Sequence, residues 1–304
     1  METAETAGTE EAPGAVPAFA RGLCDDAAVF PPGLMPLSQA VPAHREHERE
    51  RYAGLVGPLI LAAPNLGDLA PLLGQDDPLN LAVTLPAGPA QAGPALAAAA
   101  ELPVALRALE VAVPAGTAPA RFFAELDLAV RVAGEEVEVF VEVPRDERRT
   151  EIIDILATTR YQAKFRTGGV TAQLYPDERE LAAAIAAVVT AGVRFKATAG
   201  LHHAVRNTDP ETGFEQHGFL NLLLAVDAAL RGPGSGELAG VLAERSPDTV
   251  ASRVAELSGR RVDAARAVFR SFGTCSITDP LTELVELGLV QAGLIGPRSA
   301  KEKA

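Results

Sequence analysis

The stretches AKFRTGG (residues 163–169) and FKATAG (residues 195–200) share one plan. Each is a short apolar strand that carries a lysine near its end and runs into a glycine turn. If the two strands are neighbours, two ammonium groups enter one pocket, and their repulsion favours loss of a proton from one amine near neutral pH. Because a neutral lysine amine attacks carbonyl carbons, the pattern predicts Schiff-base chemistry.

The same strand-and-turn pattern recurs along the whole chain. Apolar runs closed by Pro, Gly or a polar turn predict strands near residues 23–30, 57–62, 79–85, 107–113, 137–143, 161–167, 193–199 and 270–275. Apolar residues at three- and four-residue steps predict helices near residues 37–53, 66–74, 89–101, 118–131, 148–158, 177–190, 215–230 and 279–290. This alternation predicts an α/β fold, a (β/α)8 TIM barrel whose active site lies at the carboxyl ends of the strands. A doubly wound open sheet is the competing architecture.

One domain is expected to span residues 18–297. Residues 1–17 lack periodicity and predict a disordered arm, and residues 298–304 predict a flexible tail. Between the seventh and eighth strands, residues 201–269 predict a helical insertion that covers the barrel mouth.

Composition narrows the class of protein. The formal charge of −13 and the absence of a basic stripe disfavour a nucleic-acid partner. Two cysteines are too few for a disulfide framework, and no export signal or membrane span is evident, so a cytoplasmic protein is expected. A small anionic carbonyl compound is the expected partner, no cofactor is expected, and the chain could form a homo-oligomer.

The lysines have two interpretations. Residues two apart on a strand share a face, so Lys164 should point with Arg166 and Gly168, and Lys196 with Gly200, into the barrel mouth. Alternatively, each lysine packs its stem on apolar neighbours and extends its head to solvent. Two lysines on consecutive strands, each before a glycine turn, favour the catalytic interpretation.

Acidic residues stand at matching places on other strands. Glu110 and Glu142 each lie within an apolar run that ends in proline, where a carboxylate needs a partner such as a lysine or Arg166. Glu110 could also shuttle protons through an ordered water. In the pair Asp25-Asp26, Asp26 is interpreted as an inward acid that positions the lysines, although a solvated turn is the alternative.

Two loops complete the candidate site. Small residues including Cys275 and Ser276 precede the last helix, whose first N–H groups could bind phosphate or carboxylate, unless Thr278 only caps that helix. His202 and His203 follow the seventh strand and are candidate substrate contacts.

The histidines also allow a metal-site alternative. One of His202 and His203 could bind a metal together with His217 and Glu215, although no metal is expected. His44 and His47, in an Arg- and Glu-rich run, are interpreted as a solvated helix face.

In this order the segments resemble a divergent deoxyribose-phosphate aldolase, a cofactor-free class I aldolase family on an eight-stranded α/β barrel. The motifs that carry the resemblance are DAAVFPP (26–32), EVAVP (110–114), Glu142, KFRTG (164–168), FKATAGL (195–201) and GTCS (273–276).

The resemblance implies a role for each matching residue. Lys164 would be the Schiff-base lysine, Lys196 the ammonium that lowers its pKa, Glu110 the proton-relay acid, and Gly200 with Ser276 part of a phosphate cradle. The chain departs from the family at Arg166, which replaces a small hydroxyl residue and would place a carboxylate or phosphate binder beside the reacting carbon.

The predicted function is therefore that of a lyase of the class I aldolase type. Two alternatives stay open: a metal-dependent lyase or hydrolase that uses the seventh-loop histidines, and a barrel without catalysis that serves as a binding subunit.

Overall fold

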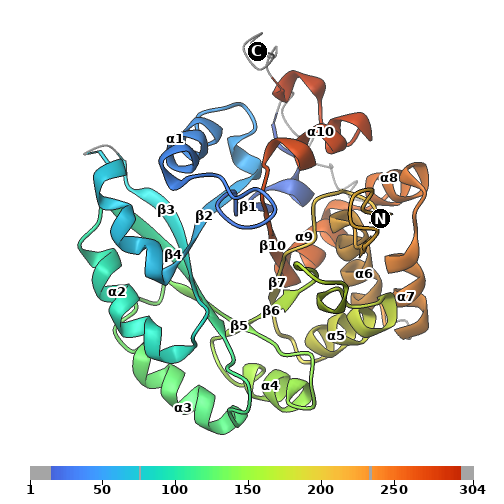
Figure 1. Cartoon of the computed structure of the whole chain (residues 1–304). Helices are drawn as coiled ribbons and strands as arrows, with labels where there is room; N and C mark the ends of the chain where they lie inside the picture. Colours follow the sequence, from blue (N-terminus) through green and yellow to red (C-terminus); the bar gives the residue numbers. More distant parts are fainter. Residues whose placement is uncertain (1–14, 75–76, 233–234, 296–304) are drawn as a thin grey trace, which may run out of the picture.

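The barrel is the central feature of the structure, a computed structural model that describes residues 15–74, 77–232 and 235–295. Eight parallel strands close in the order β1-β10-β7-β6-β5-β4-β3-β2 (Figure 1). They are β1 (Cys24–Asp26), β2 (Val56–Ala62), β3 (Leu79–Leu85), β4 (Val104–Ala112), β5 (Glu138–Glu142), β6 (Gln162–Arg166), β7 (Phe195–Thr198) and β10 (Phe269–Thr274). The predicted α/β barrel is confirmed, and the open sheet is wrong because β1 pairs with both β2 and β10.

Helices surround the barrel (Figure 1). They are α1 (Leu37–His47), α2 (Ala92–Ala100), α3 (Pro119–Ala129), α4 (Arg149–Leu156), α5 (Glu178–Thr190), α6 (Phe219–Leu230), α7 (Ser235–Ala243), α8 (Pro247–Ala255), α9 (Gly259–Val268) and α10 (Thr278–Glu286). The helix expected near 66–74 is instead two 3-10 segments, η3 (Ala63–Asp68) and η4 (Ala70–Leu72), each with a proline in its first turn. Within the described residues, no helix has both the length and the apolar character needed to cross a membrane.

The helices of the insertion after β7 pack against one another and against α5, and the expectation that the insertion covers the mouth stays a prediction. Phe219 of α6 stacks on Phe272 of β10, with ring centres 4.8 Å apart, and α6 also packs against α5, α7 and α9. The insertion is not wholly helical, because β8 (Asn207–Thr208) and β9 (Glu215–Gln216) form a small antiparallel pair.

The two faces of the strands bury different residues. Side chains such as Leu59, Leu81 and Leu109 belong to the main core shared with the helices. Ile60, Ala82, Ala108 and Phe140 alternate with them and form a separate apolar cluster on the inner face. Glu110 and Glu142 follow Ala108 and Phe140 by two positions, so the inner face changes from apolar to charged toward the carboxyl ends of β4 and β5.

The first-strand acid Asp26 points toward α1 and not into the barrel. Its Oδ2 lies 2.9 Å from Nδ1 of His44, a residue of α1 with no exposed surface. The inward position expected for Asp26 is therefore wrong, as is the solvated position expected for His44. His47 is half-buried and bonds the Tyr52 hydroxyl. Of the expected terminal segments, residues 1–14 and 298–304 lie outside the described residues, while Val16 is buried beside Gly54.

The Asp26–His44 pair predicts a loss of stability at alkaline pH. Burial opposes protonation of His44, but Asp26 and Glu48 outweigh it and raise the pKa of His44 to about 9. In the unfolded chain the pKa of His44 is about 6.5. The protonated pair therefore stabilises the folded state by up to about 3 kcal/mol below pH 6.5, and this stabilisation is lost as the pH rises through 9. Urea unfolding across this range should show the loss in the wild type and in the control His47→Gln, but not in His44→Gln. An equal pH dependence in His44→Gln would contradict this account.

Candidate active site

Lys164 of β6 and Lys196 of β7 are paired across neighbouring strands and share one carboxylate. Lys196 Nζ lies 2.5 Å from Glu110 Oε1, and Lys164 Nζ lies 2.8 Å from Glu110 Oε2. Lys196 Nζ also lies 2.5 Å from Asp25 Oδ2, and Lys164 Nζ lies 3.1 Å from Glu142 Oε2. The structure thus brings together the two lysines and the two strand glutamates that the sequence singled out.

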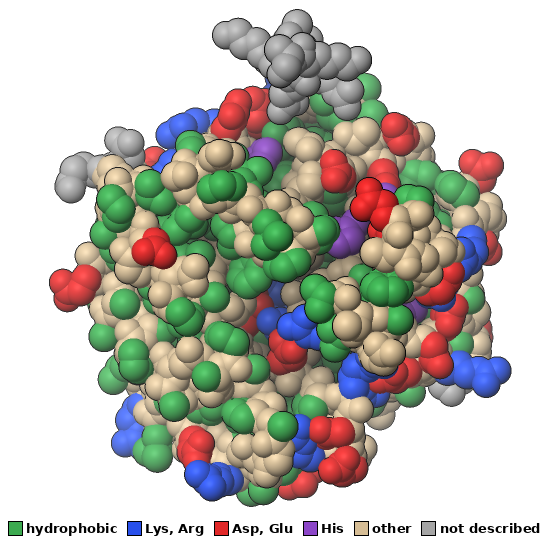
Figure 2. Space-filling model, viewed as in Figure 1, with side chains coloured by type: hydrophobic (Ala, Val, Ile, Leu, Met, Phe, Trp, Pro, Cys, Tyr) green, Lys and Arg blue, Asp and Glu red, His purple; other side chains and the backbone are tan. Residues whose placement is uncertain are grey.

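The network continues at both ends. In the interior, the Ser271 hydroxyl donates a hydrogen bond to Asp25 Oδ2 over 2.6 Å. Toward solvent, Arg166 Nε donates to Glu142 Oε1 over 2.9 Å. Side-chain exposure rises along this direction from 0% at Glu110 to 5% at Lys164, 21% at Glu142 and 38% at Arg166. Figure 2 shows charged side chains of both signs inside a hollow near the middle of the face it presents.

The sequence predicted two ammonium groups that repel each other, but in the structure each ammonium group contacts carboxylates. Burial lowers the pKa of Lys196, but Asp25 and Glu110 outweigh it and raise that pKa above its ordinary value. Burial raises the pKa of Glu110, yet Lys164 and Lys196 bring it down to about 2. Lys196 is therefore held as an ammonium and Glu110 as a carboxylate.

The glycine turns after β6 and β7 fix the two lysine strands together. A Cβ at Gly168 would lie 2.7 Å from the Gly200 Cα, so only glycine allows this approach. Gly200 also has a φ of +69°, and the Thr167 hydroxyl donates to the Ala199 carbonyl over 2.6 Å. Both glycines have this structural reason to be present, and their substrate contacts stay predictions.

The β10–α10 loop and the histidines have local partners. Ser276 Oγ accepts the Asp279 N–H over 3.2 Å in the first turn of α10. His203 Nδ1 lies 2.5 Å from Glu283 Oε1, and His202 Nδ1 lies 3.4 Å from Cys275 Sγ. Roles for Ser276, His202 and His203 in substrate binding stay predictions.

The seventh-loop histidines do not form a metal-binding set. His217 is buried and its Nε2 lies 2.8 Å from the Pro176 carbonyl, with Arg206 against its other nitrogen. Across the described part of the chain, no three His, Cys, Asp or Glu residues are grouped so that they could hold a metal ion. The structure therefore does not group the histidines and Glu215 as the metal-dependent alternative requires.

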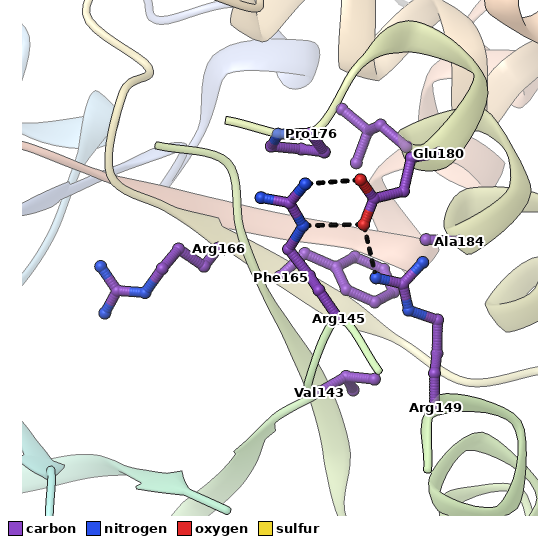
Figure 3. Close-up of a pocket in the computed structure, with 9 residues that line it drawn as sticks. Val143, Arg145, Arg149, Phe165, Arg166, Pro176, Glu180 and Ala184 are labelled. Carbon is purple, nitrogen blue, oxygen red and sulfur yellow. Dashed lines mark hydrogen bonds and ion pairs between the residues drawn. The ribbon is translucent and has the colours of Figure 1, made fainter. Parts of the chain in front are cut away.

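Three arginines line a crevice beside β5, β6 and α5, and they differ in their carboxylate partners. Arg145 and Arg149 both bind Glu180, while Arg166 lies apart from them with its guanidinium directed away (Figure 3). The crevice has a volume of about 10 Å³, about the minimum that a single water needs. Arg166 is thus not bound to Glu180 and has Glu142 as its carboxylate partner.

Asp25 and Ser271 belong to the network but were not singled out from the sequence. The three residues of β1 include two adjacent acids, and a strand this short does not reveal which acid faces inward. Ser271 lies where the pairing of β10 with β7 shifts register, between Phe269 and Phe272, so alternation along the strand does not predict its direction.

Comparisons with known proteins give one distant likeness. No protein-family model matches the chain, and no curated protein matches it. A solved structure described as a monomeric dihydrodipicolinate synthase variant aligns with a TM-score of 0.36 at 12% sequence identity, covering 90% of this chain and 98% of that one.

The shared carboxylate predicts a large stability cost for Glu110→Gln. The substitution leaves two buried lysines without their common counter-ion, and breaking a buried ion pair costs about 3–5 kcal/mol. Glu138→Gln is the control, because Glu138 lies on β5 with a 34% exposed side chain and a loose 3.7 Å pair with Arg270. Its Oε1 also accepts a hydrogen bond from Gln162 Nε2 over 2.8 Å, which the amide oxygen of Gln can still accept. The control should therefore cost less than about 1 kcal/mol. Urea unfolding at pH 7 measures both, and equal small losses would refute the shared role of Glu110.

Proposed function

We propose that this protein is a class I aldolase-like lyase that forms a Schiff base with a small anionic carbonyl compound. The observation that carries the proposal is the pair of lysines on adjacent barrel strands, joined through Glu110 near the carboxyl ends of the strands. Active sites of α/β barrels lie at this end. Lys164 would attack the carbonyl, and the resulting enamine would make or break a carbon–carbon bond.

Contacts of the two amines favour Lys164 as the nucleophile. Lys196 is enclosed, with 2% side-chain exposure and two carboxylates at 2.5 Å. Lys164 has longer contacts, and one of its partners, Glu142, is partly exposed to solvent. A carbonyl compound that enters from solvent would therefore meet Lys164 before Lys196.

The rarity of lysine in this chain supports a catalytic role for the network over a purely structural one. Of the 27 Lys and Arg residues only Lys164, Lys196, Lys301 and Lys303 are lysines, and the last two lie outside the described residues. Arginine suits fixed ion pairs because it keeps its charge, whereas lysine can give up a proton. A chain that otherwise uses arginine thus places two of its four lysines in the barrel.

The substrate class follows from Arg166. Its guanidinium is the most exposed member of the network and can hold a carboxylate or a phosphate with two parallel N–H donors. We infer that an anionic group of the substrate binds there, which would place its carbonyl near Lys164 on the same face of β6.

A non-catalytic barrel is the second candidate. The near-complete burial of Lys164 and the matching of ammonium groups with carboxylates favour it, since such a network could serve stability alone. Chemical trapping separates the two candidates.

Borohydride reduction in the presence of pyruvate or acetaldehyde should fix a covalent adduct on Lys164. Peptide mapping by mass spectrometry is simple because the chain has four lysines. The adduct should vanish in Lys164→Ala, and it should persist in the control Lys301→Arg/Lys303→Arg, which alters only the tail amines. An absent adduct on the wild type, or an unchanged one in Lys164→Ala, would end the proposal.

A further inference from the structure

The three carboxylates of the network are held in different ways. Asp25 binds Lys196 and Ser271 and has a 4% exposed side chain. Glu110 has no exposed side-chain surface, and each of its oxygens faces one ammonium group. Glu142 alone combines contact with Lys164, at 3.1 Å, with a side chain 21% exposed to solvent.

A proton carrier for imine chemistry has to meet two conditions. It must touch the reacting nitrogen, and it must reach either the substrate or water. Glu110 meets the first condition only, and its pKa near 2, set by burial against the stronger pull of two lysines, makes it a poor base. Glu142 meets both conditions.

We propose that Glu142 transfers protons between Lys164, the substrate and water, and that Glu110 is a fixed counter-ion. This inference rests on the proposed function, since it concerns the same amine. It gives Glu142 a catalytic role through direct contact with the reacting nitrogen.

Glu142 would carry each proton that imine and enamine formation require. The Lys164 ammonium group first passes one proton to Glu142. The amine lone pair then forms the C–N bond as the carbonyl π pair moves to oxygen. The oxygen takes the proton back from Glu142. Glu142 then removes a second proton from nitrogen and delivers it to the hydroxyl, which leaves as water. The product is a protonated imine, Lys–NH⁺=C, with the same net charge as the reactants. Glu142 next takes a proton from the adjacent carbon, and the C–H electron pair becomes the enamine double bond as the C=N pair moves to nitrogen.

Arg166 couples this role to substrate binding. Burial raises the pKa of Glu142, but Lys164 and Arg166 outweigh it and lower that pKa in the free protein. An anionic group bound to Arg166 would offset the guanidinium charge, so the basicity of Glu142 would increase when the substrate arrives. A neutral carbonyl compound would lack this effect.

The test compares Glu142→Gln with Glu138→Gln, a carboxylate on the same strand that lies outside the network around the lysines. Pyruvate in D2O is the probe, exchange of its methyl protons is followed by NMR, and Lys164→Ala gives the background. In Glu142→Gln, the adduct should form more slowly, but borohydride trapping carried to its end point should reach the wild-type extent, while exchange falls at least about 100-fold, the lower end of the usual contribution of general acid–base catalysis. Glu138→Gln should match the wild type in both measurements.

The outcomes separate this inference from the proposed function. Wild-type exchange in Glu142→Gln would overturn the role of Glu142 and leave the Schiff base intact. An absent adduct on the wild type would end both. If circular dichroism shows that Glu142→Gln does not fold, Glu142→Asp is the second variant. It keeps the negative charge but shortens the side chain by one methylene, which moves the carboxylate away from Lys164. That variant should trap fully and exchange at least tenfold more slowly, and unchanged exchange in it would also overturn the inference.

Discussion

The Glu110 carboxylate is the constraint on which the rest of the site depends. Two lysines on adjacent strands would repel each other in a nearly dry interior, and a carboxylate with one oxygen toward each amine removes that repulsion. The position of Glu110 at the carboxyl end of β4, across the barrel from β7, requires a closed barrel. The fold and the site are thus linked, because an open sheet would not bring β4 to face β7.

Apolar side chains inside the barrel pack next to this charge cluster. Ile60, Ala82, Ala108 and Phe140 form an apolar floor, and the Lys196 ammonium lies 5.4 Å from the centre of the Phe140 ring. This floor keeps water from the inner end of the network, which strengthens the ion pairs that hold Lys196. The outer end differs, since the side chains of Glu142 and Arg166 are partly exposed to solvent. The network therefore has a buried inner half and a partly exposed outer half.

Sequence patterns predicted the strands better than the side-chain partners. Each of the eight predicted strands is present because apolar runs closed by turns reflect burial on both faces. Lys164, Lys196, Glu110 and Glu142 could be named in advance because a charge inside such a run requires a partner. Asp25 could not be distinguished from Asp26, since the direction of a three-residue strand depends on its neighbours β2 and β10. The outer position of α6 and the burial of His44 likewise depend on packing between distant segments, which periodicity does not encode.

The most direct measurement of the central claim is an NMR titration of the protein labelled with ¹⁵N at the lysine side chains, which the small number of lysines makes tractable. The shared carboxylate predicts that the Lys196 nitrogen stays an ammonium at pH values where a free lysine, with a pKa of about 10.4, has lost its proton. It also predicts that Glu110→Gln moves this titration to lower pH. A Lys196 amine that titrates below the ordinary lysine value in the wild type would contradict the account.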